Sequence, residues 1–362
     1  MVKLKVAILD NDEIYLEKIS NVFNTKYQDK TEVYAFNNLS VLKKFLQDIR
    51  NRIDIFICTE TIEFDRKLLP SNCGFAYFCE SNSITSLYGE RTIGKYQKIE
   101  LIYKELLSIF SESSSYNLEN TNSTDEKCNI IMFSSAAGGV GCSTLAVASA
   151  IHLAKRQKQV LYLNLELFGG AENYLTTQAS QSGQSNFDNV IYALKSKRAN
   201  IPLKIESNTQ VSDENVNYFN SSKLSLSIDE LTCEDIESLL TEISLMNKYD
   251  YVIVDKGLDF NKKTWSILEK ANKIVLISDG SLISNFKTER ALQSLNVLEK
   301  KNNAQISQKI LIAYNKFSSK NGVQLNDNNY ATLGGIPVVS SISNAEILNS
   351  ISNMDIFNNL IS

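Results

Sequence analysis

The spacing of apolar residues divides the chain into two halves, and each half alternates strands with helices. Short apolar runs in the first half alternate with segments in which apolar residues recur every three or four positions. The predicted strands are 5–9, 32–36, 53–58 and 75–79, and the predicted helices are 14–23, 40–50 and 99–110. This alternation predicts a doubly wound α/β domain over residues 1–110.

The second half shows the same alternation, from residue 129 to residue 362. Strands are predicted at 130–133, 159–167, 249–255, 273–278, 309–317 and 335–339, and helices at 145–151, 187–194, 233–243 and 285–300. The helix at 233 is expected to begin with a capping box, because Thr232 stands three residues before Asp235. Residues 171–230 are polar, and their sequence predicts no function. The apolar tail from Ala345 is expected to pack on its own domain.

The segment 111–128 joins the two halves. It is rich in serine, asparagine and threonine and has no apolar period, which is typical of a linker. The predicted organisation is therefore an α/β domain at 1–110, a polar linker at 111–128 and a second α/β domain at 129–362.

Composition excludes several classes of protein. No run of eighteen apolar residues occurs and the first residues are charged, so we expect a cytoplasmic protein without membrane insertion. A net charge of −4 gives no general reason to bind nucleic acid. The six cysteines are scattered and there is one histidine, which argues against a structural metal and favours buried thiols.

A glycine-rich stretch after strand 130–133 carries the clearest chemistry. Gly138, Gly139 and Gly141 precede an apolar helix, so backbone N–H groups and the positive end of the helix dipole face one place. Such a place suits a polyphosphate, and Ser143 stands where a phosphate loop carries its magnesium-binding hydroxyl. The alternative is a flexible turn between a strand and a helix.

The order of glycines resembles the deviant Walker A motif of the MinD/ParA family of ATPases. That family has lysines at the positions of Ala137 and Cys142, so this loop keeps its shape and hydroxyl but lacks both side-chain cations. We therefore expect nucleotide binding without fast hydrolysis. Cys142 is either merely a small residue or a redox-sensitive thiol at a helix N-terminus, where its pKa is expected to be depressed. The resemblance implies nucleotide contacts from Ala137, Gly138, Gly139, Val140, Gly141, Cys142, Ser143 and Thr144.

Two acidic residues follow buried strands. Asp255 closes the strand 249–255 in the Walker B pattern, and Glu166 stands with Asn164 where the family has a pair of aspartates. The resemblance implies that Ser143, Asp255 and Glu166 hold Mg²⁺, and the two carboxylates are the candidate catalytic residues. The alternative for Glu166 is a solvated residue at a strand end.

Two later positions match the family's base-binding residues. Asn315 lies near the end of the strand 309–317, where the family's asparagine amide reads the adenine edge, and Pro337 lies in the short strand that packs beside the base. The cofactors implied by the resemblance are ATP and Mg²⁺.

The N-terminal domain resembles the receiver domain of response regulators. Asp10 and Asp12 close the first strand, where receivers hold magnesium, and Lys95 falls near the late receiver lysine. Thr59 stands in place of the phosphoacceptor aspartate, so the domain is expected to dock or dimerise rather than to be phosphorylated. The alternative for Asp10 and Asp12 is a solvated helix entry.

The order of the two domains resembles the CpaE/TadZ family, cytoplasmic proteins of the Flp (Tad) pilus assembly system that are often found at a cell pole. The resemblance implies an ATP-binding localisation scaffold that forms a homodimer and contacts pilus assembly and secretion proteins, without nucleic acid. One alternative is an active ATPase that positions cargo by a nucleotide-driven dimerisation cycle. A second alternative is a transcription or partition factor. The acidic net charge and the absence of a recognisable helix-turn-helix both argue against it.

Overall fold

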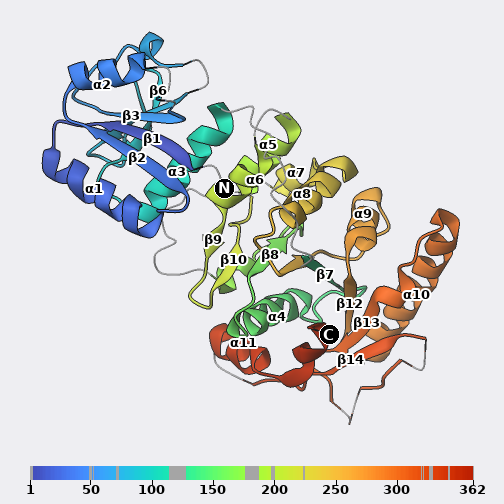
Figure 1. Ribbon diagram of the computed structural model, residues 1–362. Coiled ribbons are helices and arrows are strands. Elements are labelled where there is room, and N and C mark those ends of the chain that lie inside the picture. The colour runs from blue at the N-terminus through green and yellow to red at the C-terminus, as the bar shows by residue number, and fades with distance from the viewer. Residues whose placement is uncertain are drawn as a thin grey trace. The chain divides into compact units, whose positions relative to one another are not determined.

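The computed structural model divides the chain into two compact units. One unit combines Met1–Asn122 with Ser196–Ser207, and the other combines Ser123–Lys195 with Asn208–Ser362. Each unit is built on its own sheet (Figure 1). The structure describes residues 3–48, 51, 53–70, 73–113, 128–175, 187–196, 200–222, 225–318, 320, 322–325, 329–340 and 343–361.

The first unit has a six-stranded sheet in the order β2-β1-β3-β4-β6-β5. The strands are parallel except β5, which pairs antiparallel with β6 at the edge. The predicted doubly wound domain is confirmed, and the hairpin that contains β5 and β6 is an addition that the sequence pattern did not predict. The strands are β1 Leu4–Leu9, β2 Thr31–Phe36, β3 Ile55–Thr59, β4 Gly74–Cys79, β5 Ser86–Leu87 and β6 Glu90–Gly94.

Helices cover both faces of this sheet (Figure 1). Apolar residues of α1 and α3 pack on the face that carries Val6 and Ile8, whereas Leu42 of α2 packs on the face that carries Ala7 and Leu9. Alternation along β1 thus fills two separate cores. The helices are α1 Glu13–Lys26, α2 Leu39–Gln47, the short η1 Arg66–Leu68 and α3 Ile99–Ser113.

The first unit includes two segments that lie outside the predicted domain at 1–110. Helix α3 continues to Ser113, three residues into the predicted linker, and residues 114–127 lie outside the described residues. Helix α6 (Ile201–Asn208) lies in the polar stretch 171–230, for which no function is predicted, yet Leu203 packs against the core of α1 and α3. Lys204 Nζ of the same helix lies 2.6 Å from Glu112 Oε1.

The second unit has an eight-stranded sheet in the order β14-β13-β12-β7-β11-β8-β10-β9. All its pairs are parallel except β9 with β10. Strand β7 is central, so the loop that follows it opens between β11 and β12. The strands are β7 Asn129–Ser134, β8 Val160–Asn164, β9 Gln210–Val211, β10 Val216–Tyr218, β11 Tyr251–Asp255, β12 Lys273–Ser278, β13 Ile310–Tyr314 and β14 Ala331–Gly335.

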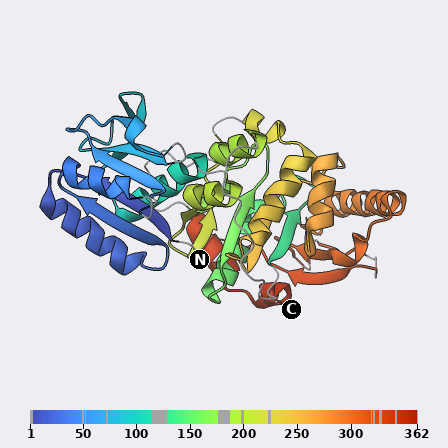
Figure 2. The same ribbon diagram turned by 45° about the horizontal axis from the view of Figure 1, so that its top comes forward.

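The helices of the second unit form layers on either side of the sheet (Figures 1 and 2). Helices α4 and α11 pack together on one face, and α8 and α9 pack together on the other. The predicted capping box is confirmed at the start of α8, where Thr232 and Asp235 exchange hydrogen bonds. The helices are α4 Cys142–Lys155, η2 Ala171–Tyr174, α5 Phe187–Ser196, α7 Ser225–Asp229, α8 Cys233–Leu245, α9 Lys262–Lys270, α10 Leu282–Asn302, η4 Ser307–Lys309, α11 Asn344–Ser352 and η5 Asp355–Leu360.

The C-terminal segment confirms one prediction and corrects another. Leu348 and Phe357 are buried in the core shared with α4, so the tail packs on its own domain as predicted. The predicted strand 335–339 is wrong, because β14 ends at Gly335 and Pro337 lies in the loop after it. Among the described residues, no helix is long and apolar enough to cross a membrane.

Candidate nucleotide-binding site

The loop between β7 and α4 has a backbone conformation that suits the binding of an anion at the start of α4. Gly139 has φ +77° and Gly141 has φ +86°, a region that glycine adopts without strain. Gly141 is the N-cap of α4 and provides no side-chain acceptor for the helix. The N–H groups of the first turn, which includes Ser143 and Thr144, therefore remain suited to an anion.

Asn315 fixes the shape of this loop from the end of β13. Its Nδ2 donates to the carbonyl oxygen of Val140 at 2.8 Å, and the side chain is buried. A Cβ built on Gly141 would lie 2.3 Å from the same Nδ2. Gly141 is thus required by its backbone conformation and by the close approach of Asn315.

Asp255 lies beside the loop, fully buried at the end of β11. Its position follows from pairing, because Asp255 lies opposite Phe133 of β7 and Asn164 of β8. The hydroxyl of Tyr162 donates to Asp255 Oδ2 at 2.7 Å, and Cys142 Sγ lies 4.0 Å from Oδ1. The role of Tyr162 was not predicted; its only sequence signal is a hydroxyl within an otherwise apolar strand.

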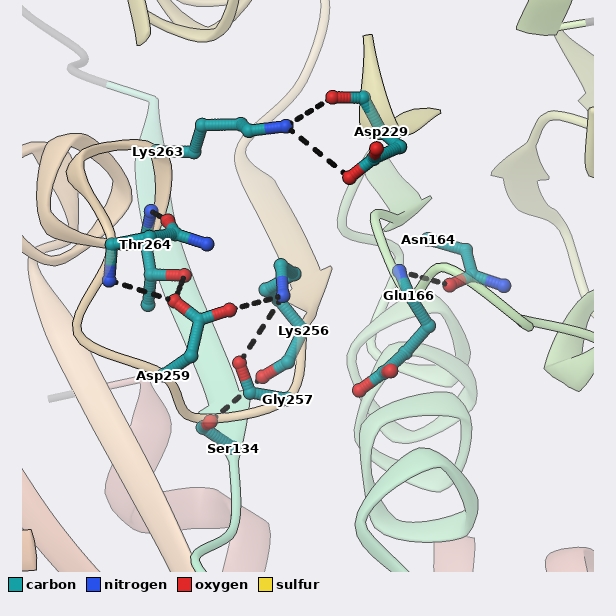
Figure 3. A network of polar contacts seen from close by, with 10 residues as sticks. Ser134, Asn164, Glu166, Asp229, Lys256, Gly257, Asp259, Lys263 and Thr264 are labelled. Carbon is teal, nitrogen blue, oxygen red and sulfur yellow. Dashed lines mark hydrogen bonds and ion pairs between the residues drawn. The ribbon is translucent and has the colours of Figure 1, made fainter. Parts of the chain in front are cut away.

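Glu166 approaches the same edge from the neighbouring strand. Asn164 Oδ1 accepts a hydrogen bond from the Glu166 backbone N–H at 3.0 Å, so Asn164 supports the turn after β8 (Figure 3). A Cβ built on Gly257, two residues after Asp255, would lie 3.1 Å from Glu166 Oε1. Glu166 is half-buried, and its carboxylate lies against the loop after β11.

A polar network ties the loop after β11 to the end of β7 (Figure 3). Ser134 Oγ donates to the Lys256 carbonyl oxygen at 2.7 Å, and Lys256 Nζ lies 3.2 Å from Asp259 Oδ2. Burial acts to raise the pKa of Asp259, but hydrogen bonds from Thr264 and the Asn261 N–H, with the charge of Lys256, lower it overall. The network holds the residues that follow Asp255.

The expectation of a depressed pKa for Cys142 is wrong. Burial is the largest cause and, together with the nearby charges of Asp255 and Glu166, raises the pKa of this thiol well above its usual value. A thiolate here would be desolvated and repelled by two carboxylates, which outweighs the helix N-terminus. All six cysteines are free thiols, and Cys58, Cys73 and Cys79 are buried.

A cavity of about 230 Å³ lies beside the loop. Thr144, Asn315 and Pro337, which the sequence assigned to one nucleotide, all line it. Helix α11 also lines this cavity. The sequence analysis did not predict this, because the tail carries no nucleotide-binding motif. The other lining residues are Tyr174, Lys316, Val338, Val339, Asn344, Ile347, Leu348 and Ile351.

The remaining predicted positions also lie around the loop. Ala137 is buried in the core cluster with Val140, Cys142 and Ser143 are half-buried in the first turn of α4, and a Cβ built on Gly138 would meet nothing within 4 Å. The oxygen donors Ser143, Asp255 and Glu166 are of the type that Mg²⁺ prefers, and Mg²⁺ needs few protein ligands. Within the described residues, no group of three or more His, Cys, Asp or Glu side chains is arranged to hold a metal by itself.

The first unit has a second polar cluster at the ends of β1 and β6. Lys95 Nζ lies 2.8 Å from Asp10 Oδ2 and 3.8 Å from Asp12 Oδ2. Asp10 is only 1% exposed, so it does not form a solvated helix entry, while Asp12 caps α1 by accepting from the Tyr15 N–H. Thr59 is buried at the end of β3. An internal cation thus neutralises the acidic residues.

Comparison with known proteins places both halves in families. Residues 2–111 match the family model described as TadZ-like, receiver domain, and residues 128–308 match the model described as AAA domain. The second half therefore has a MinD/ParA-like P-loop fold. The chain belongs to the family described as AAA domain, whose model covers half of its residues, and a TadZ-like receiver domain precedes the AAA domain.

Solved structures agree with this fold. A ParA family ATPase from Chlorobium tepidum is 20% identical, with 66% of this chain and 99% of that chain covered and a TM-score of 0.53. A chain of the MinC:MinD cell division protein complex of Aquifex aeolicus is 16% identical, with 65% of this chain and 96% of that chain covered and a TM-score of 0.51. The sequence matches none of the curated proteins with which it was compared.

Proposed function

We propose that this protein is an ATP-binding localisation and assembly scaffold for a Flp (Tad) type IV pilus secretion system, with weak or no ATP hydrolysis. One observation carries the proposal. The loop from Gly138 to Thr144 keeps the backbone geometry that holds a polyphosphate, while the two lysine positions are a buried Ala137 and a protonated Cys142. The site is thus equipped to bind a nucleotide and poorly equipped for phosphoryl transfer.

Each part of the nucleotide has a place in this proposal. The N–H groups of the loop and the first turn of α4 hold the phosphates, and Asn315 and Pro337 border the cavity that takes the base. Ser143, Asp255 and Glu166 hold Mg²⁺, which supplies positive charge to the phosphate oxygens when bound. Adenine is the base that the family resemblance implies.

Slow hydrolysis follows from the charges at the loop. Phosphoryl transfer depends on cations that offset charge developing on the phosphate oxygens. The raised pKa of Cys142 keeps its thiol neutral, and Lys155 lies at the far end of α4, where it binds Asn349, Ser352 and Asn353. A site with this composition binds ATP as a stabilising ligand.

Exposed apolar residues support dimerisation through the ATPase-like domain. Phe168 follows β8, Phe260 follows β11 and Leu282 follows β12, and these side chains are 86%, 47% and 86% exposed. Parallel strands place their carboxyl ends at one edge, which is also where the phosphate loop lies. Apolar side chains gathered at such an edge suit a protein interface. We propose that a second copy covers them, and that the receiver-like domain recruits pilus assembly proteins in the cytoplasm, at a cell pole.

Calorimetric titration tests nucleotide binding directly. The wild-type chain is titrated with ATP and with ADP, with and without Mg²⁺, beside a Gly141→Arg variant whose side chain would enter the space of Asn315. Magnesium-dependent ATP binding that the variant loses supports the proposal, provided that circular dichroism shows a folded variant. A wild-type chain that binds neither nucleotide contradicts it.

Sedimentation with and without ATP then tests dimerisation. The same oligomeric state in both conditions would refute control of dimerisation by the nucleotide.

The rival function is an active MinD/ParA-type ATPase that positions cargo by a nucleotide-driven dimerisation cycle. The observation in its favour is that Glu166 and Asp255 both approach the loop, and both raise the pKa of Cys142. A turnover assay separates the two functions. A rate well above that of Ser143→Ala would establish the ATPase, whereas equal rates would exclude it.

A further inference from the structure

Helix α11 lines the cavity beside the phosphate loop, and it packs along α4 (Figure 1). Helix α4 begins at the loop with Cys142 and ends at Lys155. Leu348 and Ile351 of α11 belong to the buried core that α4 shares, and both also line the cavity of about 230 Å³. The position of α11 against α4 therefore sets one side of this cavity.

Two side chains of α4, His152 and Lys155, reach the C-terminal end of α11. His152 is only 2% exposed, and its Nδ1 lies 2.8 Å from the Ser352 carbonyl oxygen. A carbonyl oxygen can only accept, so the imidazole ring donates this bond. The Lys155 ammonium donates to side-chain oxygens of Asn349, Ser352 and Asn353, at 3.0, 2.9 and 2.8 Å. All three of its donors are thus used on the end of α11.

Helix α11 depends on such contacts from outside. It has nine residues, and a helix of this length is not stable in water by itself. The last carbonyl groups of a helix have no partner within it, and they form the negative end of the helix dipole. The sequence of α11 contains no lysine, arginine or histidine that could serve this end. Helix α4 therefore supplies both a donor to a terminal carbonyl and a positive charge.

We propose that His152 and Lys155 are positioning residues, which cap the end of α11 and thereby hold one side of the cavity in place for the nucleoside part of a bound nucleotide. The inference rests on the proposed nucleotide binding. Both residues lie at the opposite end of α4 from the phosphate loop, so neither contacts the phosphates. By linkage, a nucleoside that binds against the docked α11 also stabilises the docked position of this helix.

A set of variants removes the contacts of α4 with α11 and controls for other effects. Lys155→Met and His152→Phe are made singly and together, and both replacements keep a side chain of similar size on α4. Lys155→Arg keeps the charge and the donors. The matched control is Lys273→Met, because Lys273 Nζ donates to the carbonyl oxygens of Asn359 and Leu360 at 3.0 and 3.2 Å. The control thus removes a lysine from the same C-terminal segment, at η5 instead of α11.

Calorimetric titration of the full chain with ATP and with inorganic tripolyphosphate, both with Mg²⁺, separates the nucleoside part from the phosphates. The double variant is expected to bind ATP about tenfold more weakly, because the hydrogen bonds that hold the end of α11 are lost. Its affinity for tripolyphosphate stays unchanged. Lys155→Arg and Lys273→Met bind ATP as the wild type does. In the wild type, ATP is expected to slow hydrogen exchange of the α11 amides.

The outcomes that overturn the inference differ from those that overturn the proposed function. Equal ATP affinity of the wild type and the double variant removes the inference and leaves the proposed function intact. Equal losses for ATP and tripolyphosphate make His152 and Lys155 supports of α4 and its loop only. A wild-type chain that binds no ATP refutes both proposals together. Thermal unfolding shows whether each variant is folded, and exchange in wild-type α11 that ATP leaves unchanged contradicts the inference without any variant.

Discussion

At the scale of single residues, the site depends on side chains that hold Asp255 in place. Tyr162 donates to this buried carboxylate at 2.7 Å, and the two residues lie on neighbouring strands, β8 and β11. A donor to a charged, buried acceptor contributes more than an ordinary hydrogen bond. The position of Asp255 therefore depends on a hydroxyl within the core.

We expect Tyr162→Phe to lower the free energy of unfolding by about 1–3 kcal/mol, because Asp255 loses this buried donor. Urea denaturation followed by circular dichroism measures the change. Tyr192→Phe removes a hydroxyl from a side chain that is 75% exposed and should be neutral. Equal stability of Tyr162→Phe and wild type would show that the bond to Asp255 contributes nothing.

Cys142 decides the charge of the loop at the same scale. We expect Cys142→Lys to strengthen ATP binding by about tenfold, because an ammonium near Asp255 restores a cation beside the phosphates. Titration calorimetry measures the affinity, and Cys233→Lys, at the start of α8, is the control for added charge. Unchanged affinity of Cys142→Lys would mean that the loop does not present this position to phosphates.

At the scale of elements, the end of β6 is fixed to the end of β1 by the pair of Lys95 and Asp10. Burial acts to lower the pKa of Lys95, but hydrogen bonding and attraction to Asp10 raise it overall. A raised lysine pKa stabilises the fold below the unfolded pKa of about 10.4, and this contribution is lost as pH rises through the folded value. The pair should thus hold at neutral pH.

We expect Lys95→Met to lower the free energy of unfolding by about 3–5 kcal/mol, because Asp10 would stay buried without its cation. Lys26→Met is the matched control, since Lys26 pairs with Glu100 at the surface and such pairs contribute about 0–1 kcal/mol. Thermal and urea unfolding at pH 7 compare the two variants. Similar losses in both would contradict a special role of the buried pair.

At the scale of the whole molecule, α6 shows that a unit need not be continuous in sequence. This helix lies between α5 and β9 along the chain, yet its residues up to Ser207 belong to the first unit. Lys204 is 6% exposed, and its Nζ donates to Glu112 at 2.6 Å and to Ser108 at 3.0 Å. A receiver-like domain cut out at residue 113 would lack these contacts.

We expect Lys204→Met to lower the stability of the first unit by about 1–2 kcal/mol, because hydrogen bonds to a charged group are lost. Hydrogen exchange measures the effect as faster exchange in the last turns of α3. The control is Lys195→Met, which removes a more exposed pair with Glu230. Unchanged exchange in α3 would show that Lys204 does not hold α6 to the first unit.

Local sequence determined much of this protein. Periodicity located most strands and helices, Thr232 and Asp235 marked the start of α8, and the glycines from 138 to 141 marked the loop before α4. These features depend on neighbouring residues, since helix caps, alternation and glycine conformations act within a few positions. The same reasoning failed at 335–339, where a short apolar run without flanking context does not fix strand boundaries.

Only the tertiary structure decided how the charges and donors meet. Tyr162 reaches Asp255, Lys95 reaches Asp10 and Lys316 reaches Gly139 because the order of strands in each sheet brings their ends together. Strand order is set by packing over the whole unit and leaves no periodic signal in the sequence. The sequence by itself thus determined a phosphate loop without lysines, and the fold decided which distant side chains surround it.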